Sequence, residues 1–436
     1  MERDRIFSIL LLCMLFITLY YSSNSLEKNT IISSEMKKIK YQPTFSYTPH
    51  ESIMIRNDSD FSSFPGTGTE ADPYRIENYN ISEDSAFGKS LLIQETTKFF
   101  LIKNCLFQNT GQAIDINHVA NNTASIINNY LDLEHQGIHI SKSPYSHIED
   151  NYIVNAHVGI ILSQSFNSIV LNNTFDNNSL TGMMVGDSGF SKIEKNSFVN
   201  CGLSILDDDI DILSSYVLND NKVNNKKIGY FLNYNDEFFE NKAYGQIYYI
   251  NSSFVTIKNL NITNVSYGIR LIKCRNFIIK DSSFDNNDVS LSIRLSLFTR
   301  ITRCYIKHGD IGVVFSHSNN SIVSYSQVEK CEDYTIDISL KSFGNVIHHN
   351  TFIDNAKHTY FICNKSQAAD SGENNSWYFN YWSDYSGEGS YIIDGRAWSV
   401  DKYPLRNIPM RIDLDFVIFF IGFISISSIY LYIEEN

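Results

Sequence analysis

Four aspartates crowd into the stretch LDDDID: Asp207, Asp208, Asp209 and Asp211. Paired carboxylates can run the acid, base and nucleophilic steps of glycoside hydrolysis. Several carboxylate oxygens gathered together also suit Ca²⁺. The stretch therefore predicts either a catalytic centre acting on carbohydrate or a calcium site. A solvated acidic turn is the competing interpretation, and it is the one we favour.

Three histidines form a second candidate group. His135 and His157 occupy equivalent positions in successive copies of a sequence repeat, so we expect them to stack on neighbouring turns of the chain. His139 lies nearby, with Glu134, Asp115 and His118 as further polar neighbours. Imidazole and carboxylate groups bind divalent metals. The group predicts a site for a divalent metal, and the alternative, which we favour, is a set of polar surface side chains at a corner.

The repeat positions all of these groups. It reads apolar-x-x-Asn-x-apolar, and most copies are 22 to 26 residues apart. The first apolar position falls at Ile76, Ile102, Ile126, Ile148, Val170, Ile193, Leu218, Ile257, Ile279, Ile301, Val323, Ile347 and Trp377. The second falls at Ile81, Phe107, Leu131, Ile153, Phe175, Phe198, Val223, Ile262, Phe284, Ile306, Val328, Phe352 and Trp382. Internal periods of this length indicate a solenoid.

Asparagine fills the fourth position in seven copies: Asn129, Asn151, Asn173, Asn196, Asn221, Asn350 and Asn380. Asn tolerates the left-handed backbone region, and stacked amides hydrogen-bond as a ladder. We therefore expect these residues to bend the chain between short strands. A second strand pattern, often opened by Gly, follows in each copy, as in GIIL at Gly159. The fold class predicted is all-β: a single right-handed parallel β-helix of about 13 coils.

The two ends of the chain differ from its body. The apolar run Ile6–Tyr21 predicts a signal peptide over residues 1–25, or an uncleaved anchor. Residues 26–50 lack periodicity and predict a linker. Residues 412–433 contain an uncharged run of eighteen residues, long enough for a transmembrane helix. Arg406 and Arg411 precede that run, which is the wrong charge bias for an exported body.

Motifs near the ends of the body are more specific than its coils. GTGTEADPY begins at Gly66, NYWSDYSG at Asn380 and DKYPL at Asp401. With these motifs the chain resembles the NosD-type right-handed β-helix proteins, also described as CASH domains with a pectin-lyase-like fold. The resemblance implies an exported β-helix over residues 51–405, with an N-terminal cap near 64–81 and an aromatic C-terminal cap at 374–405. The namesake of the family is associated with copper.

Composition narrows the function classes. The net charge of −13 argues against nucleic acid as a partner. Seven scattered cysteines form no CxxC motif, and the adjacent Met183 and Met184 should point to opposite faces of a strand, so a copper site is not expected. The leading prediction is a membrane-tethered, exported surface protein that binds glycans, a surface-layer polymer or neighbouring surface proteins without catalysis. A carbohydrate-active enzyme using Asp207 to Asp211 is the first alternative, and NosD-like metal handling is the second.

Overall fold

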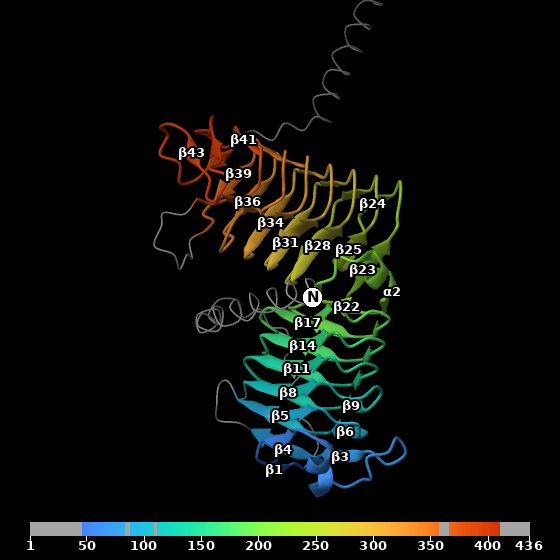
Figure 1. Cartoon of the computed structure of the whole chain (residues 1–436). Coiled ribbons are helices and arrows are strands. Elements are labelled where there is room, and N and C mark those ends of the chain that lie inside the picture. The colour runs from blue at the N-terminus through green and yellow to red at the C-terminus, as the bar shows by residue number, and fades with distance from the viewer. Residues whose placement is uncertain (1–45, 83–87, 109–110, 357–365, 410–436) are drawn as a thin grey trace, which may run out of the picture.

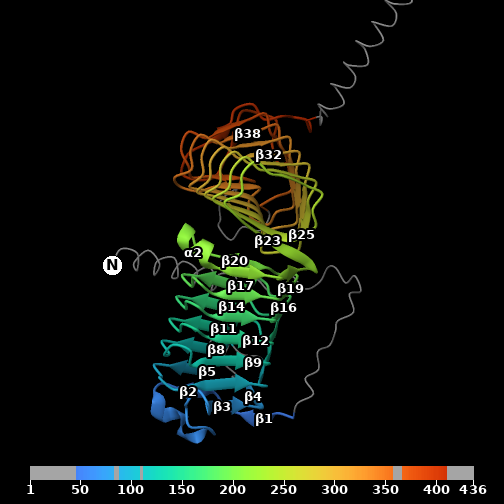
Figure 2. The same ribbon diagram turned by 90° about the vertical axis from the view of Figure 1, so that its right-hand side faces the viewer.

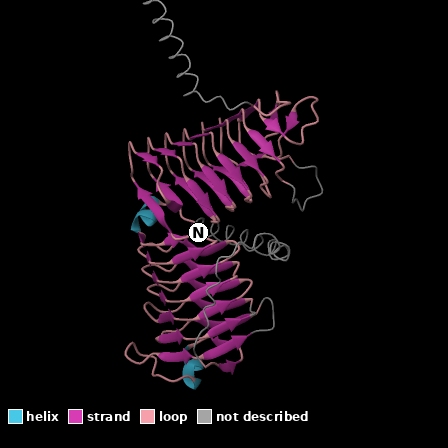
Figure 3. Ribbon diagram, turned by 180° about the vertical axis from the view of Figure 1, so that it is seen from behind, coloured by secondary structure: helices cyan, strands magenta, loops and turns pink. Residues whose placement is uncertain are grey.

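The computed structural model describes residues 46–82, 88–108, 111–356 and 366–409. Over these ranges the chain is an all-β, right-handed parallel solenoid of about 14 turns, which confirms the predicted fold class. Two stacks of coils meet at a bend (Figures 1 and 2). We call them the lower stack, residues 46–223, and the upper stack, residues 226–409. Figure 3 shows that strands build both stacks and that the two short helices lie at the N-terminal end and at the bend.

Three parallel sheets run up the lower stack. The sheet with the longest strands holds β2 (Ile53–Ile55), β5 (Lys89–Gln94), β8 (Gln112–Asn117), β11 (Gln136–Ser141), β14 (Val158–Ser163), β17 (Thr181–Gly186) and β20 (Leu203–Ile205). The next holds β3 (Tyr74–Glu77), β6 (Phe100–Lys103), β9 (Ala124–Ile127), β12 (His147–Glu149), β15 (Ile169–Leu171), β18 (Lys192–Glu194) and β21 (Val217–Asn219). The third holds β1 (Thr48–His50), β4 (Tyr79–Ser82), β7 (Leu106–Gln108), β10 (Tyr130–Asp132), β13 (Tyr152–Val154), β16 (Thr174–Asp176), β19 (Ser197–Val199) and β22 (Lys222–Val223).

The third sheet continues into the upper stack, where it carries the long strands. These are β23 (Lys226–Leu232), β25 (Tyr244–Ile250), β28 (Tyr267–Ile272), β31 (Val289–Arg294), β34 (Ile311–Ser316), β37 (Ile336–Ile338) and β40 (Ala369–Asp370). A second sheet holds β24 (Phe238–Glu240), β26 (Thr256–Lys258), β29 (Ile278–Lys280), β32 (Arg300–Thr302), β35 (Ile322–Ser324), β38 (Val346–His348), β41 (Ser376–Tyr378), β43 (Tyr391–Ile392) and β44 (Val400–Asp401). The last holds β27 (Asn261–Thr263), β30 (Ser283–Asp285), β33 (Tyr305–Lys307), β36 (Gln327–Glu329), β39 (Thr351–Ile353) and β42 (Tyr381–Trp382). The helices are η1 (Asp58–Ser63) and α2 (Ile210–Ser215).

The repeat builds one continuous apolar core. All thirteen residues at the second apolar position of the repeat are buried, and so are those at the first position except the partly buried Leu218. Each side chain packs on the equivalent side chain of the next coil, as the rings of Phe175 and Phe198 do at a centroid distance of 4.7 Å. Because each coil buries its apolar face only against its neighbours, no coil is stable alone.

The buried asparagines form the predicted ladder. The Oδ1 atom of Asn151 accepts hydrogen bonds from the backbone N and the Nδ2 of Asn129, at 3.0 and 2.9 Å. Asn173 accepts from Asn151 in the same way, and the chain of bonds continues through Asn196 to Asn221. In the upper stack Asn350 bonds to Asn380. Each coil therefore supplies the acceptor for a buried donor of the coil before it.

The ladder asparagines do not turn the chain at the corners of the coils, so that part of the prediction is wrong. The left-handed residue stands one position earlier, as at Asn128, Asp150 and Asn172, with φ of 56°, 55° and 56°. At these corners the left-handed residue lies at the surface, while the following asparagine is buried beneath the corner. The ladder position therefore requires an amide side chain that points inward. The position before it requires a residue that tolerates the left-handed backbone conformation.

The glycines that open strands are required by the close packing of adjacent coils. A Cβ atom on Gly159 would lie 2.3 Å from the carbonyl oxygen of Gly182, and one on Gly137 would lie 2.3 Å from that of Gly159. No side chain fits at that distance. Glycine there lets the backbones of adjacent coils approach each other.

A two-residue reversal of the chain produces the bend between the stacks. It also explains why 39 residues separate Leu218 from Ile257 in the repeat, whereas most copies are 22 to 26 residues apart. Asn224 and Asn225 both have positive φ, 49° and 63°, and they connect β22 to the antiparallel β23. Positive φ at both central residues is the requirement of a type I′ hairpin turn, in which Asn is favoured. From β23 onward the strands of this sheet run opposite to those below, with β25 parallel to β23. The tyrosine hydroxyl of Tyr248 donates to the carbonyl oxygen of Leu203 across the junction, at 2.6 Å.

The C-terminal cap closes the upper ladder with a carboxylate. Oδ2 of the buried Asp401 accepts from the backbone N and Nδ2 of Asn380, both at 3.0 Å, and from the indole Nε1 of Trp382, at 3.2 Å. Trp377 and Trp382 are buried, as expected of an aromatic lid, and Trp382 stacks on Tyr391 at 4.1 Å. Trp398 is 89% exposed and takes no part in the lid. The DKYPL motif thus supplies the last acceptor of the ladder.

The predicted end segments lie outside the described residues. These are the signal segment 1–25 and the transmembrane helix 412–433. No helix within the described ranges is long and apolar enough to cross a bilayer. The first described strand, β1, begins at Thr48, inside the predicted linker, and pairs with β4.

Replacing a ladder asparagine by leucine should destabilise the protein. Asn151→Leu or Asn173→Leu removes an acceptor and leaves buried donors without a partner, so we expect each to lower the free energy of unfolding by about 2–4 kcal/mol. Denaturant unfolding of the full chain measures this. The exposed Asn172→Gly is the matched control and should stay within about 0.5 kcal/mol of the parent. Equal midpoints for all variants would contradict the ladder's role.

The cap residue should show a sharper contrast. Asp401→Ala leaves at least three buried donors unpaired and should cost about 3 kcal/mol or more, whereas Asp401→Asn keeps an acceptor oxygen and should cost less than half as much. Thermal and denaturant melts compare the two variants. An alanine variant as stable as the asparagine variant would rule out a capping role.

Candidate functional site

The acidic stretch is distributed among separate structural contacts. The carboxylate of Asp207, at the end of the lower stack, accepts the hydroxyl of Tyr216 at 2.6 Å and the backbone N–H of Asp187 at 2.8 Å. Burial raises the pKa of Asp207 above its ordinary value, although both hydrogen bonds favour the charged form. The side chain thus holds the end of the stack together.

The other three aspartates face different partners. Asp208 binds the guanidinium of Arg294 through two hydrogen bonds and so connects the two stacks. Asp209 caps helix α2, accepting the backbone N–H of Asp211 at 2.9 Å, and Asp211 stands in the first turn of that helix. The structure gives these carboxylates structural contacts rather than one shared pocket. Their use in catalysis or calcium binding stays a prediction.

The three candidate histidines are divided between two places. His135 and His157 stack at one corner as predicted, with the backbone N–H of His157 donating to the carbonyl of His135 at 2.7 Å. Burial and the neighbouring His135 lower the pKa of His157 to about 4, so its ring is neutral near pH 7. His139 lies on β11, where its Nδ1 is 3.1 Å from Oδ1 of Asp115. In the part of the chain that the structure describes, no three His, Cys, Asp or Glu side chains are arranged to hold a metal ion.

A column of left-handed corner residues carries several exposed aromatic side chains. We call it the corner column: Asn122, Tyr145, Asn167 and Phe190 in the lower stack, and Asp236, Phe254, Asn276, Phe298 and Asn320 in the upper stack. Their φ angles lie between 54° and 64°, and the backbone N–H groups of these residues donate to the next coil, as Phe254 does to Arg275 at 3.1 Å. Aromatic residues therefore alternate along it, from coil to coil, with Asn or, at residue 236, Asp.

The aromatic members of the corner column are accessible to a partner. Tyr145, Phe190, Phe254 and Phe298 are 46%, 66%, 56% and 42% exposed. Tyr145 and Phe190 are two coils apart, as are Phe254 and Phe298, which is about 10 Å at the usual strand spacing. The guanidinium of Arg275 lies 5.3 Å from the centre of the Phe298 ring and occupies one of its faces. The spacing leaves ring faces separated by shorter polar side chains.

Folding alone does not explain these aromatics. A left-handed backbone costs an ordinary residue about 1–2 kcal/mol, and Asn bears it more easily than Phe or Tyr. Asn occupies the same position on the alternating coils, so the backbone accepts it there. An exposed ring gains little from burial to offset the strain. Strained and exposed side chains of this kind are characteristic of functional surfaces.

A second aromatic row, near the C-terminal cap, is arranged differently. Tyr325 stacks on His349 at 5.2 Å, His349 lies 5.3 Å from Phe379, and Phe379 stacks on Tyr403 at 5.6 Å. A hollow of about 220 Å³ beside Tyr325 and His349 is also lined by Ile408. Because these rings cover one another's faces, they present edges rather than platforms.

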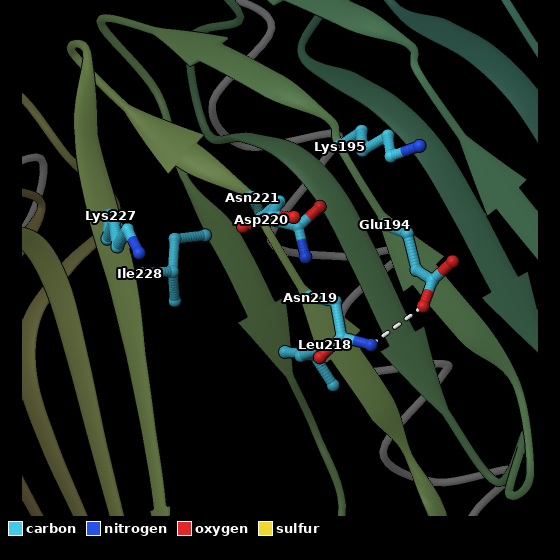
Figure 4. A pocket seen from close by; sticks show the side chains of 8 residues that line it. All are labelled: Glu194, Lys195, Leu218, Asn219, Asp220, Asn221, Lys227 and Ile228. Carbon is cyan, nitrogen blue, oxygen red and sulfur yellow. Dashed lines mark hydrogen bonds between the residues drawn. The ribbon is translucent and has the colours of Figure 1, made fainter.

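A second hollow lies at the bend, where the ladder ends at Asn221 (Figure 4). It measures about 440 Å³ and has a mixed lining: Glu194, Lys195, Leu218, Asn219, Asp220, Asn221, Lys227 and Ile228. The amide of Asn219 donates to Glu194 at 2.8 Å. Figure 4 shows the charged groups spread apart rather than pointing to one centre. We interpret the hollow as the gap left by interrupted coil stacking.

Two family models match adjoining parts of the chain. The model for NosD, the periplasmic copper-binding protein, matches residues 77–245. The model for the right-handed β-helix region matches residues 245–397. The two matches meet at Gly245, in β25 of the upper stack, and together they cover residues 77–397. The chain is a NosD-type right-handed β-helix protein.

Solved structures similar to this NosD-type protein are distant in sequence. ORF18 of Geobacillus virus E2 is 12% identical, with a TM-score of 0.23 over 77% of this chain and 60% of its own. A tailspike of E. coli bacteriophage HK620, solved with a pentasaccharide, is 9% identical, with a TM-score of 0.23 over 71% and 57%. A mutant of the periplasmic alginate epimerase AlgG is 13% identical, with a TM-score of 0.23 over 82% and 85%. This chain spans less than two thirds of the length of the two viral proteins, and no curated protein matches it.

The residues present do not fit copper. Cys105, Cys201, Cys274, Cys304 and Cys331 are unpaired and buried. Burial raises the pKa of each thiol to about 12, so none supplies a thiolate near neutral pH. Met183 is fully buried and Met184 half-buried, on opposite faces of β17 as expected. The described part of this NosD-type protein thus lacks a soft-ligand cluster.

The corner column was missed in the sequence because exposure cannot be assigned from composition. A usable pattern exists: SPYS at Ser143, SFNS at Ser165 and SGFS at Ser188 align, and the serines bond coil to coil. In this alignment Tyr145 and Phe190 replace Asn167. An aromatic at a position that otherwise requires Asn is the observation that marks the surface.

Replacing the upper aromatic pair by asparagine should raise stability. Phe254→Asn and Phe298→Asn each relieve strain, and we expect a gain of about 0.5–1 kcal/mol per site in the free energy of unfolding. Denaturant midpoints of the full chain test this. The buried Phe277→Asn is the control and should lose several kcal/mol. Losses of similar size at all three positions would show that the corner rings are packing residues.

Proposed function

We propose that this protein is an exported β-helix that binds an extended glycan at the cell surface without cleaving it. Export is supported by the apolar N-terminal run and by the description of the matching model as periplasmic. Membrane tethering through residues 412–433 is part of the proposal and rests on sequence alone.

The single observation that carries the proposal is the set of exposed, strained aromatics of the corner column. Sugar rings present flat arrays of C–H groups that pack against aromatic faces, and the sugar hydroxyls need polar partners at the edge. Phe254 and Phe298 offer two apolar platforms, with the amide of Asn276 between them. A spacing of two coils, about 10 Å, matches a partner that is extended along the rod rather than a compact ligand.

The contacts of the acidic stretch support binding over catalysis. Asp207 is buried by Tyr216, Asp208 is neutralised by Arg294, and Asp209 caps a helix. Glycoside hydrolysis needs two carboxyl groups facing one sugar. Nothing in the described residues brings such a pair to the corner column, so the enzyme is the weaker alternative.

A glycan array with the full chain, purified in a mild nonionic detergent, tests the proposal. We expect binding to one class of extended polysaccharide, with no shortened product by mass spectrometry, with or without added Ca²⁺. Turnover would overturn the non-catalytic assignment and direct mutagenesis to Asp207 to Asp211. Absence of binding to any glycan would leave a protein partner or a structural coat.

The double variant Phe254→Asn/Phe298→Asn locates the binding surface. It should fold at least as stably as the parent and lose binding by about tenfold or more, since buried aromatics dominate binding energies. Leu340→Asn is the matched control, because Leu340 is an exposed apolar residue, at 51%, outside the column. Unchanged binding by the double variant would exclude the upper half of the corner column.

A further inference from the structure

Among the residues that the structure describes, one buried cation of the upper stack has no counter-charge. Arg270, on β28, is 6% exposed, and its Nε and Nη1 atoms meet no acceptor within the described residues. Its guanidinium carbon lies 4.7 Å from the centre of the Tyr267 ring, so one face of the group is covered. Burying a charge without a hydrogen-bonding partner is strongly unfavourable. The chain has a net charge of −13, so its sequence contains many carboxylates that could have paired with this cation.

The neighbouring arginine shows what Arg270 lacks. Arg294, on the adjacent strand β31, binds Asp208 through two hydrogen bonds and donates to Ser316 at 3.0 Å. Figure 1 shows β28 and β31 on the side of the upper stack that faces the lower stack, at the inner corner of the bend. Arg294 is in register with Ile272, two residues along the strand from Arg270, so the two arginines lie on the same face of adjacent strands, one neutralised and one not.

The residues in register with Arg270 favour a ligand that carries oxygen atoms. Its in-register neighbours are Tyr248 below and Ser292 above. The hydroxyl proton of Tyr248 is already donated to Leu203. Ser292 is 7% exposed, and within the described ranges its hydroxyl makes no hydrogen bond. Arg270 and Ser292 thus place a guanidinium and a hydroxyl on the same face of adjacent strands, whose backbones are about 5 Å apart.

We propose that the inner corner of the bend binds a carboxylate, with Arg270 as its counter-ion and Ser292 as a second donor. Guanidinium and carboxylate are planar and complementary, and each carries one charge. A doubly charged phosphate is less suited, because Asp208 lies beside the adjacent Arg294. The carboxylate can belong to an acidic sugar or to a small organic acid. This site is separate from the corner column, so the inference does not depend on the proposed glycan function.

Thermal unfolding of the full chain tests the site. Galacturonate and glucuronate are compared with galactose and glucose, and acetate and phosphate are compared with chloride at equal ionic strength. We expect carboxylates to raise Tm by a few degrees above these controls, since a ligand that binds only the folded state stabilises it. A response to uronates and acetate alike identifies a simple carboxylate site, and a response to uronates alone identifies an acidic sugar. A shift by phosphate or chloride as large as that by carboxylates would overturn the proposal, as would no shift at all.

Two variants separate binding from a structural role. Arg270→Met should weaken carboxylate binding roughly tenfold to a hundredfold, and without ligand it should melt at or above the parent, because an unpaired buried charge is removed. The control Arg300→Met changes an exposed arginine on another sheet and should keep the parent's response. If Arg270→Met retains the response, or melts well below the parent, the guanidinium is structural. If that variant does not fold, glucuronate is titrated by calorimetry into the parent and into Arg270→Lys. Binding to the parent that is weaker in the lysine variant supports the site, and equal binding to both contradicts it.

Discussion

A corner of a β-helix buries backbone N–H groups that no strand of the same coil can satisfy, and the next coil must supply the acceptor. In this protein the acceptor is an amide or hydroxyl oxygen, from Asn129 through Asn221 below and from Ser326 through Asn380 above. A bond of this kind cannot be made by one coil for itself. Every coil therefore depends on a successor, and the series needs a final acceptor where the stacking of coils stops.

The two stacks end this series in different ways. The upper ladder ends on Asp401, a carboxylate that only accepts. The lower ladder ends at Asn221, whose side-chain Oδ1 is the last acceptor, for Asn196. The backbone carbonyl oxygen of Asn221 accepts from the backbone N–H of Ile228, beyond the reversal at Asn224 and Asn225. The bend and the aromatic cap are thus two responses to one requirement. They also explain why the most specific sequence motifs lie at the ends of the body and the least specific in its coils.

Much of this could be predicted from the sequence, because the core repeats. Spacing alone identified the buried positions from Ile81 to Trp382 and the buried amides. The bend could not be predicted, since Asn224-Asn225 is two more asparagines in a chain rich in them and only the backbone shows the reversal. The ladder residue and the left-handed residue were confused because both favour Asn for different reasons. The candidate sites drawn from clusters of Asp and His stay predictions. In the structure Asp208 pairs with Arg294, and His139 lies beside Asp115. The corner aromatics and Arg270 become visible only once exposure and pairing are known.

The reversal at Asn224 and Asn225 also divides the cooperativity of the molecule. In a solenoid, stability is close to a sum of nearest-neighbour interfaces, and order spreads from coil to coil until an interface is weak. At the bend the buried ladder is interrupted, and the stacks are joined by one continuing sheet, through β22 and β23, and by side-chain bonds such as those of Tyr248 and Arg294. Each stack can therefore nucleate and propagate on its own side of that junction. Under mechanical load the rod has a built-in point at which one half can unravel while the other stays folded.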